Sequence, residues 1–275
     1  MNAGRYAGKT VWVTGGGSGL GRAMAQAFAQ EGAAVCAIGR RKEPLDETVA
    51  LIESAGGSAF GIACDVRDPE RVEATAREIV ARTGRLDVLV NNAAGNFVAP
   101  SEKLSPNGFK SVVDIVLNGT FHCTRYAFDE LRKTRGAVLN IIATYAWSGE
   151  PGALHSACAK AGVLAMTRTL AAEWGQFGIR VNAIAPGPIH TEGTDKNLWS
   201  IADVEATVVK QVPLGRLGET GDVSRAALWL CSDEANWVSG AALPVDGAHW
   251  LHGGTLNFRA AYDAYAGAAP EAQKQ

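Results

Sequence analysis

A glycine-rich segment, Thr14–Gly21 (TGGGSGLG), is the feature that most constrains the fold of this 275-residue chain. It lies between a short apolar stretch, Thr10–Val13, typical of a buried strand, and an alanine-rich stretch, Leu20–Gln30, with helical periodicity. Glycines at such a turn let the backbone approach a pyrophosphate, and the first turn of the helix supplies N–H donors and a partial positive charge. This context predicts nucleotide binding and makes a purely structural turn the weaker interpretation.

Strand-like and helix-like segments alternate along the whole chain. The strands expected from apolar runs are Thr10–Val13, Ala34–Ile38, Ser58–Ala63, Leu86–Val90, Ala137–Ile142, Arg180–Ile184 and Ala242–Val245. Near-continuous apolar strands separated by helices predict a parallel sheet covered on both faces. Right-handed crossovers then give an α/β fold, a doubly wound Rossmann-type domain with seven parallel strands.

No linker, repeat or low-complexity stretch divides the chain, so residues 1–275 are expected to form one domain. The segment at about 188–217 is too long for an ordinary connection and carries apolar residues, which predicts a short helical lid over a site. The small, polar residues at about 266–275 predict a flexible tail. Residues Pro106–Leu131 are expected to form one long helix.

Charge and composition limit the classes of partner. The net charge is −2, from 26 basic and 28 acidic residues without a polybasic block, which disfavours nucleic acid or an anionic membrane as the main partner. The five cysteines are scattered and no apolar run is long enough to span a bilayer, so a reducing, cytoplasmic location is expected. His249 and His252 are three residues apart but lack an evident third ligand, so no metal site is predicted.

The residues after the second strand indicate which cofactor is used. An acidic residue at this place would bind the ribose 2′-OH of NAD, whereas an arginine accommodates the 2′-phosphate of NADP. The chain has Arg40 and Arg41 there and no nearby aspartate, which favours NADPH, although either arginine could instead be a solvated surface charge. Asp65 ends the third strand and could accept a hydrogen bond from the adenine amine or cap the next helix.

Polar residues at the carboxyl edge of the sheet are candidates for the chemistry. The run Asn91–Gly95 (NNAAG) follows the fourth strand, and Tyr145 follows the fifth. Asn118 lies in an apolar helical run and needs a hydrogen-bond partner. Ser156 and Lys160 share one helix face, and a lysine beside a cofactor can hold ribose hydroxyls and lower the pKa of a neighbouring phenol.

These motifs resemble the short-chain dehydrogenase/reductase family over nearly the whole chain. The finer pattern NNAAGNF, DIVLNGT, ATYA, HSACAKAGV, LAAEWG and APGPI is similar to that of the NADPH-dependent 2,4-dienoyl-CoA reductases, with the bacterial members closest. In that group serine replaces the usual tyrosine four residues before the lysine, as Ser156 does here. A tyrosine after the fifth strand takes over its work, as Tyr145 would here, fifteen residues before Lys160.

The resemblance implies reduction of a 2,4-dienoyl-CoA thioester to a trans-3-enoyl-CoA in unsaturated fatty-acid β-oxidation. Tyr145 and Asn118 would hydrogen-bond the thioester oxygen, Lys160 would hold the nicotinamide ribose, and Ser156 would bond near the thioester. The residues assigned to the cofactor are Gly15, Gly17, Ser18, Gly19, Leu20, Gly21, Arg40, Arg41, Asp65, Val66, Asn91, Ala93, Lys160, Pro186, Gly187 and Ile189. Those assigned to the acyl-CoA substrate are Arg67, Asn96, Phe97, Asn118, Tyr145 and Ser156.

Other functions remain open at this point. A carbonyl reductase or alcohol dehydrogenase could share the scaffold, but Ser156 leaves its substrate oxygen without the usual proton donor. A non-catalytic NADPH-binding protein would also tolerate loss of that tyrosine. A Ser–His hydrolase is disfavoured because His155 and Ser156 are consecutive on a helix and do not face each other. The apolar helices Ser111–Phe128 and Ser156–Trp174, together with the family resemblance, predict a homotetramer.

Overall fold

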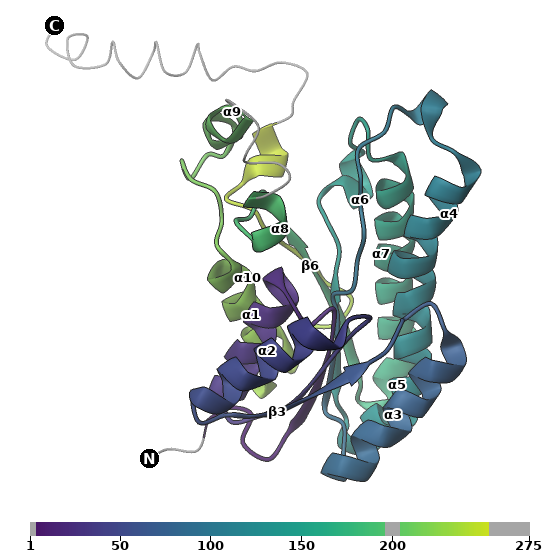
Figure 1. The fold of residues 1–275 in the computed structure, drawn as a ribbon, viewed down its shortest axis with the longest axis vertical. Coiled ribbons are helices and arrows are strands. Elements are labelled where there is room, and N and C mark those ends of the chain that lie inside the picture. Colours follow the sequence, from purple (N-terminus) through teal and green to yellow (C-terminus); the bar gives the residue numbers. More distant parts are fainter. Residues whose placement is uncertain (1–3, 196–203, 253–275) are drawn as a thin grey trace, which may run out of the picture.

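The computed structural model describes residues 4–195 and 204–252, and Figure 1 shows their arrangement. Seven strands form one parallel sheet in the order β3-β2-β1-β4-β5-β6-β7, which confirms the predicted doubly wound α/β fold. The strands are β1 Thr10–Thr14, β2 Ala34–Gly39, β3 Ser58–Ala63, β4 Val88–Asn91, β5 Ala137–Ile141, β6 Arg180–Pro186 and β7 Ala242–Val245.

Helices cover both faces of this sheet. Helices α1, α2 and α10 lie on one side, whereas α3, α5 and α7 lie on the other (Figure 1). The helices are α1 Gly19–Gln30, α2 Lys42–Ser54, α3 Pro69–Thr83, α4 Pro106–Val113, α5 Gly119–Thr134, α6 Tyr145–Ser148, α7 Leu154–Trp174, α8 Glu192–Thr194, α9 Val204–Gln211 and α10 Thr220–Cys231. The shorter helical segments are η1 Ser101–Lys103, η2 Asp114–Asn118, η3 Gly175–Phe177, η5 Asp233–Ala235 and η6 His249–His252.

Alternation of side chains along the central strands divides the core between the two faces. Val11 and Val13 on β1 pack with Phe28 of α1, whereas Trp12 between them packs in the cluster on the opposite face. All three β1 side chains are fully buried. The sheet is therefore a rigid platform, and side chains at its carboxyl edge are held in fixed positions.

Two sequence expectations differ from the structure or fall partly outside it. The helix expected over Pro106–Leu131 is interrupted at Asp114–Asn118 by one π-helical turn, and its last part extends to Thr134. The predicted lid at 188–217 contains α8 and α9, but residues 196–203 lie outside the described part of the chain. The predicted tail at 266–275 also lies outside it.

The order of the strands in the sheet indicates where the site lies. From β1 the chain proceeds outward through β2 and β3, then returns to β4 on the other side of β1. Ligands of open α/β sheets bind beyond the carboxyl ends of the strands at such a switch point. The glycine-rich segment after β1 and the NNAAG run after β4 both lie there. In the described ranges, no helix is both long and apolar enough to cross a membrane.

Candidate active site

The turn between β1 and α1 has a backbone conformation that favours glycine. Gly15 and Gly19 have φ angles of 66° and 50°, in the left-handed region. A Cβ at Gly21 would lie 2.1 Å from the carbonyl oxygen of Gly15, so any side chain there would displace the turn. Helix α1 begins without a side-chain cap at Ser18, which leaves its first N–H groups available to an anion.

Asn92 fixes this turn to the neighbouring strand, a role that the sequence analysis did not assign. Its side-chain amide donates to the carbonyl oxygen of Thr14 at 3.0 Å, and its backbone N–H donates to the Thr14 hydroxyl at 2.9 Å. The backbone N–H of Ala93 donates to the same hydroxyl at 2.9 Å. A polar residue at or beside the start of each of the two motifs, Thr14 and Asn92, is the sequence signal that could have indicated this link.

Asn91, which the sequence assigned to the cofactor, has its side chain in the protein interior. Its amide donates to Thr124 Oγ1 at 2.8 Å and to Asn140 Oδ1 at 2.9 Å, and Asn140 continues the chain of bonds to Thr167. Side chains alternate along a strand, so of two consecutive asparagines only one faces the cleft. Asn92 lines the reaction cleft described below, and the side chain of Asn91 braces β4 against β5.

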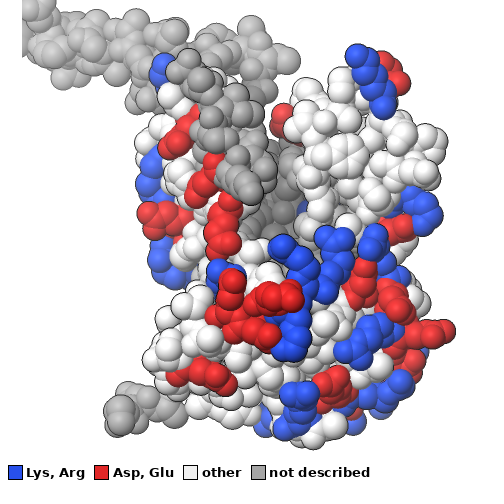
Figure 2. Space-filling model, viewed as in Figure 1, with Lys and Arg blue, Asp and Glu red and all other residues white. Residues whose placement is uncertain are grey.

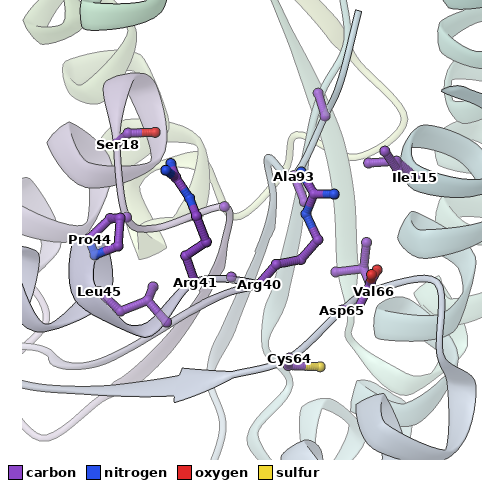
Figure 3. Close-up of a pocket in the computed structure, with 14 residues that line it drawn as sticks. Ser18, Arg40, Arg41, Pro44, Leu45, Cys64, Asp65, Val66, Ala93 and Ile115 are labelled. Carbon is purple, nitrogen blue, oxygen red and sulfur yellow. The ribbon is translucent and has the colours of Figure 1, made fainter. Parts of the chain in front are cut away.

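The nucleotide cleft is a hollow beside the end of β2, and its lining includes Gly17, Arg40, Arg41, Asp65 and Val66. Figure 3 shows both arginine side chains extending from the end of β2 along this cleft. Among the described residues, neither guanidinium has a hydrogen bond or ion pair, and both side chains are exposed. Two unpaired guanidinium groups beside an uncapped helix start suit an additional phosphate.

Asp65 and Arg67 are engaged with each other. The Arg67 Nε donates to Asp65 at 3.0 and 3.1 Å, and the hydrogen bond from Arg67 lowers the pKa of the carboxyl. The aspartate is therefore ionised at neutral pH and still lines the nucleotide cleft, as an acceptor for an amine. Arg67, assigned to coenzyme A, is half-exposed beside that cleft.

The reaction cleft, of about 510 Å³, lies between the glycine-rich turn and the start of α7. This volume is within the range of sites for small molecules, about 300–1,000 Å³. The predicted catalytic residues Tyr145, Ser156 and Lys160 line it together with Asn96. The predicted cofactor residues among its lining are Gly15, Ser18, Gly19, Leu20, Ala93, Lys160, Pro186, Gly187 and Ile189. Residues of the cleft not predicted from sequence include Thr191, Gly193 and Thr194.

Tyr145 and Ser156 form the polar pair of this cleft. The phenol oxygen of Tyr145, at the start of α6, lies 3.1 Å from the hydroxyl oxygen of Ser156 on α7. Burial raises the pKa of the phenol above its ordinary value of 10, and the Ser156 hydrogen bond opposes this only in part. The expected lowering of this pKa by Lys160 is not found, and Tyr145 is a neutral hydrogen-bond donor at physiological pH.

Lys160 is buried below this pair. Its ammonium group donates to the carbonyl oxygen of Ile141, the last residue of β5, which holds the side chain against the sheet. Burial lowers the pKa of Lys160 from 10.5 to about 8, because a charged amine is poorly solvated there. The lysine is therefore positioned to donate to a ligand in the cleft, and its charge is sensitive to mildly alkaline pH.

Asn118, expected beside Tyr145, is not among the residues that line the reaction cleft. It ends the π-helical turn η2, is exposed, and donates to the Asp114 carboxylate at 3.0 Å. The extra residue in a π turn changes which side chains face α7, which a regular helix pattern does not reveal. Asn96, in the loop after β4, shares the cleft with Tyr145 and Ser156, and the amide of Asn92, which also lines it, is bonded to Thr14.

Phe97, assigned to the substrate, is not among the residues that line this cleft, but it follows Asn96, which is, and with its apolar neighbours forms an apolar rim. Phe97 lies with its ring centroid 4.3 Å from that of the buried His155, one residue before Ser156. Other large side chains nearby along the chain are exposed; they are Val98, Phe109, Trp147 and Leu154. Figure 2 shows the region over the tops of α4 and α7 as mostly uncharged, in contrast to the basic and acidic side chains below it.

Comparison with known proteins places this geometry in a family. The protein-family model described as enoyl-(acyl carrier protein) reductase matches residues 15–248 of this chain. A probable 2,4-dienoyl-CoA reductase, (2E)-enoyl-CoA-producing, of Bacillus subtilis is 47% identical over 247 residues, covering 89% of this chain and 97% of that protein. The chain belongs to the short-chain dehydrogenase/reductase family.

Other members of the family carry related names. The peroxisomal 2,4-dienoyl-CoA reductase, (3E)-enoyl-CoA-producing, of Arabidopsis thaliana is 41% identical over 255 residues, covering 89% of this chain and 85% of that protein. The crystal structure of a putative 2-deoxy-D-gluconate 3-dehydrogenase from Agrobacterium tumefaciens with bound NADP matches with a TM-score of 0.83 and 36% identity. That match covers 91% of this chain and 99% of the other. This chain is therefore an oxidoreductase with the fold of a family that uses nicotinamide cofactors.

Proposed function

We propose that this protein is an NADPH-dependent 2,4-dienoyl-CoA reductase. The observation that carries the proposal is the Tyr145–Ser156 pair, 3.1 Å apart beside buried Lys160. A serine at the usual tyrosine position, with a tyrosine supplied from the start of α6, moves the hydrogen-bond donor to another side of the cleft. Relatives of 38–47% identity named as 2,4-dienoyl-CoA reductases support this assignment.

NADPH would fit the two clefts as they stand. The uncapped start of α1 would receive the pyrophosphate, and Arg40 and Arg41 would receive the 2′-phosphate. Lys160 would bond the nicotinamide ribose. Gly187 lets the backbone of the cleft wall lie close to Asp246, since a Cβ there would lie 2.5 Å from Asp246 Cβ. When bound, NADPH supplies the hydride for C5 of the dienoyl group. The relative with bound NADP supports this choice of cofactor.

The neutral phenol of Tyr145 would donate a hydrogen bond to the thioester oxygen as charge develops there. A donor whose pKa is raised by burial stays protonated throughout and needs no proton exchange before the reaction. Asn96, which lines the same cleft, is the amide best placed to give a second hydrogen bond to that oxygen. We retain Asn118 only as an alternative, because its amide is bonded to Asp114.

The substrate would lie along the apolar rim. Exposed Phe97, Val98 and Leu154 suit a fatty acyl chain, and Arg67, exposed beside the nucleotide cleft, suits coenzyme A phosphates. Protonation at C2, next to the thioester carbon, would yield the trans-3-enoyl-CoA, as used in β-oxidation of unsaturated fatty acids. Protonation at C4 would instead give the 2-enoyl product, and the names of the relatives include both outcomes.

We further propose a homotetramer in a reducing compartment such as the cytosol. Phe121 on α5 is 52% exposed, and Cys158 on α7 is exposed as well, so these helices offer a surface to a second subunit. All five cysteines are free thiols, which suits a reducing compartment.

The decisive experiment follows NADPH oxidation with 2,4-hexadienoyl-CoA and identifies the product by NMR. Turnover with a 3-enoyl product is the expected result. A 2-enoyl product would move the protonation site to C4 and leave the reaction class intact. NADPH binding without turnover would refute the substrate, and turnover of ketones or sugar acids instead would establish the carbonyl-reductase alternative.

A further inference from the structure

Arg22 joins three parts of the protein that are distant in sequence. It lies in the first turns of α1, and its guanidinium donates to the carbonyl oxygen of Gly17 at 2.6 Å. It also donates to Glu47 of α2 and to Glu192 of α8, each at 2.9 Å, and to the Thr48 hydroxyl at 3.1 Å. The side chain is only 17% exposed. Each of its three side-chain nitrogens donates to at least one of these acceptors, so it is a structural link rather than a surface charge.

One end of this link is the wall segment, residues 189–195, which closes one side of the reaction cleft. Thr191 and Thr194 line the cleft and cap the short helix α8 through mutual hydrogen bonds. Thr191 packs against the glycine-rich turn, since a Cβ at Gly19 would lie 3.5 Å from Thr191 Cβ. Glu192 is the first residue of α8, and through it Arg22 holds the wall segment to α1.

The other end of the link is the phosphate-binding turn itself. Gly17, whose carbonyl accepts from Arg22, lines the nucleotide cleft with Arg41. The same guanidinium therefore contacts both the turn that receives the cofactor and the segment that borders its reactive end. A shift of the turn on binding would move the group that holds the wall segment, and the reverse also follows because such coupling is reciprocal.

We propose that Arg22 is a positioning residue that couples NADPH binding to the placement of the wall segment through Glu192. The inference rests on the proposed function only in taking NADPH as the cofactor. Arg22 with Glu47 and Glu192 carries a net charge of −1, and its loss leaves −2 beside the phosphate site. Removing Arg22 thus combines a positional and an electrostatic effect, and the two glutamates allow these effects to be separated.

The separation uses a matched pair of variants, Glu192→Gln and Glu47→Gln. Both glutamates bond Arg22 at 2.9 Å, and their side chains are 63% and 65% exposed. They differ mainly in the element that they tie to Arg22, which is α8 for Glu192 and α2 for Glu47. Charge alone predicts that either glutamine tightens NADPH binding, because a carboxylate near phosphates is removed. Positioning predicts that only Glu192→Gln releases the wall segment and weakens binding.

The measurement is the dissociation rate and Kd of NADPH from the binary complex, by stopped-flow fluorescence. We expect Glu192→Gln to release NADPH about three- to fivefold faster, the scale of one partly exposed ion pair. Glu47→Gln should bind as tightly as wild type or more tightly. Arg22→Gln/Glu192→Gln should release NADPH no faster than Arg22→Gln, because the bond to Glu192 is already lost. Arg22→Lys serves if Arg22→Gln does not fold.

Several outcomes would overturn the inference. These are equal effects of the two glutamate variants, or a double variant whose release rate is the product of the two single effects. A merely structural pair would be revealed if Glu192→Gln, without NADPH, lost as much free energy of unfolding in urea as it loses in free energy of NADPH binding. The wild type is measured first without acyl-CoA, so failure to bind NADPH refutes the proposed cofactor and not the coupling.

Discussion

Replacing Tyr145 with phenylalanine tests the displaced donor directly. The change removes one oxygen atom and leaves the ring in its half-buried place at the start of α6. Within the described structure the only partner lost is the Ser156 hydroxyl, 3.1 Å away. One neutral hydrogen bond contributes about 0.5–1.5 kcal/mol to stability, so the variant should fold and should still bind NADPH.

The expected effect on the rate is much larger than the effect on stability. Removing one donor from an oxyanion site typically lowers kcat by about 10²–10³-fold, or about 2.7–4 kcal/mol in activation free energy. Burial that raises the phenol pKa also excludes water that could replace the lost donor. Because the phenol is neutral below pH 10, this loss should be nearly independent of pH from 6 to 9.

The assay is steady-state NADPH oxidation with a dienoyl-CoA, with Ser156→Ala as the matched control. Ser156→Ala breaks the same hydrogen bond but keeps the phenol donor, so we expect about a tenfold loss, the scale of one neutral hydrogen bond. Equal losses in the two variants would mean that Tyr145 acts only by holding Ser156. A Tyr145→Phe enzyme within tenfold of wild type would refute the oxyanion role.

The remaining predictions concern Lys160, Arg40, Asn96 and Gly21. Lys160 has its pKa lowered to about 8, so kcat/KM should fall as pH rises through about 8, whereas Lys160→Met should have low activity at every pH. Between about 8 and 10.5 the unfolded chain binds more protons at this lysine, so its contribution makes the free energy of unfolding rise with pH, measurable in urea titrations. Arg40→Ala should raise the KM for NADPH about tenfold and leave that for NADH unchanged, the scale of one charged hydrogen bond. Asn96→Ala should lower kcat more than Asn118→Ala, and the reverse order would return the donor role to Asn118. Gly21→Ala should abolish NADPH binding, measured by fluorescence, because its Cβ would meet the Gly15 carbonyl oxygen.

The sheet could be predicted almost completely from sequence, because its strands are buried on both faces and read as continuous apolar runs. The glycine-rich turn could be predicted from its glycines, since glycine adopts φ angles such as 66° at Gly15 at the least steric cost. Lys160, Ser156 and Tyr145 are likewise found from spacing, because strand ends and helix faces fix where they lie. These features depend on local sequence and on the fixed geometry of the sheet.

The structure differs from the sequence-based predictions where an offset of one residue decides which way a side chain points. Asn91 and Asn92 are adjacent and chemically identical, yet only the second lines the cleft, because successive side chains point to opposite sides. Asn118 ends a π turn, and nothing in an apolar helical pattern shows that one residue has been added. The Arg22 link is also hidden from sequence, since its partners Glu47 and Glu192 are 25 and 170 residues away.

The pKa directions of Tyr145 and Lys160 have a common cause, and this connects the fold to the chemistry proposed. Burial raises the pKa of the phenol and lowers that of the amine, so in both groups it opposes the charged form. An alcohol dehydrogenase that uses its tyrosine as a base needs an ionised phenol, which this environment disfavours. Donation to a thioester oxygen needs only a neutral phenol held in place, which Ser156 and α6 provide. The electrostatics of the cleft thus favour reduction of a conjugated thioester over oxidation of an alcohol on the same scaffold.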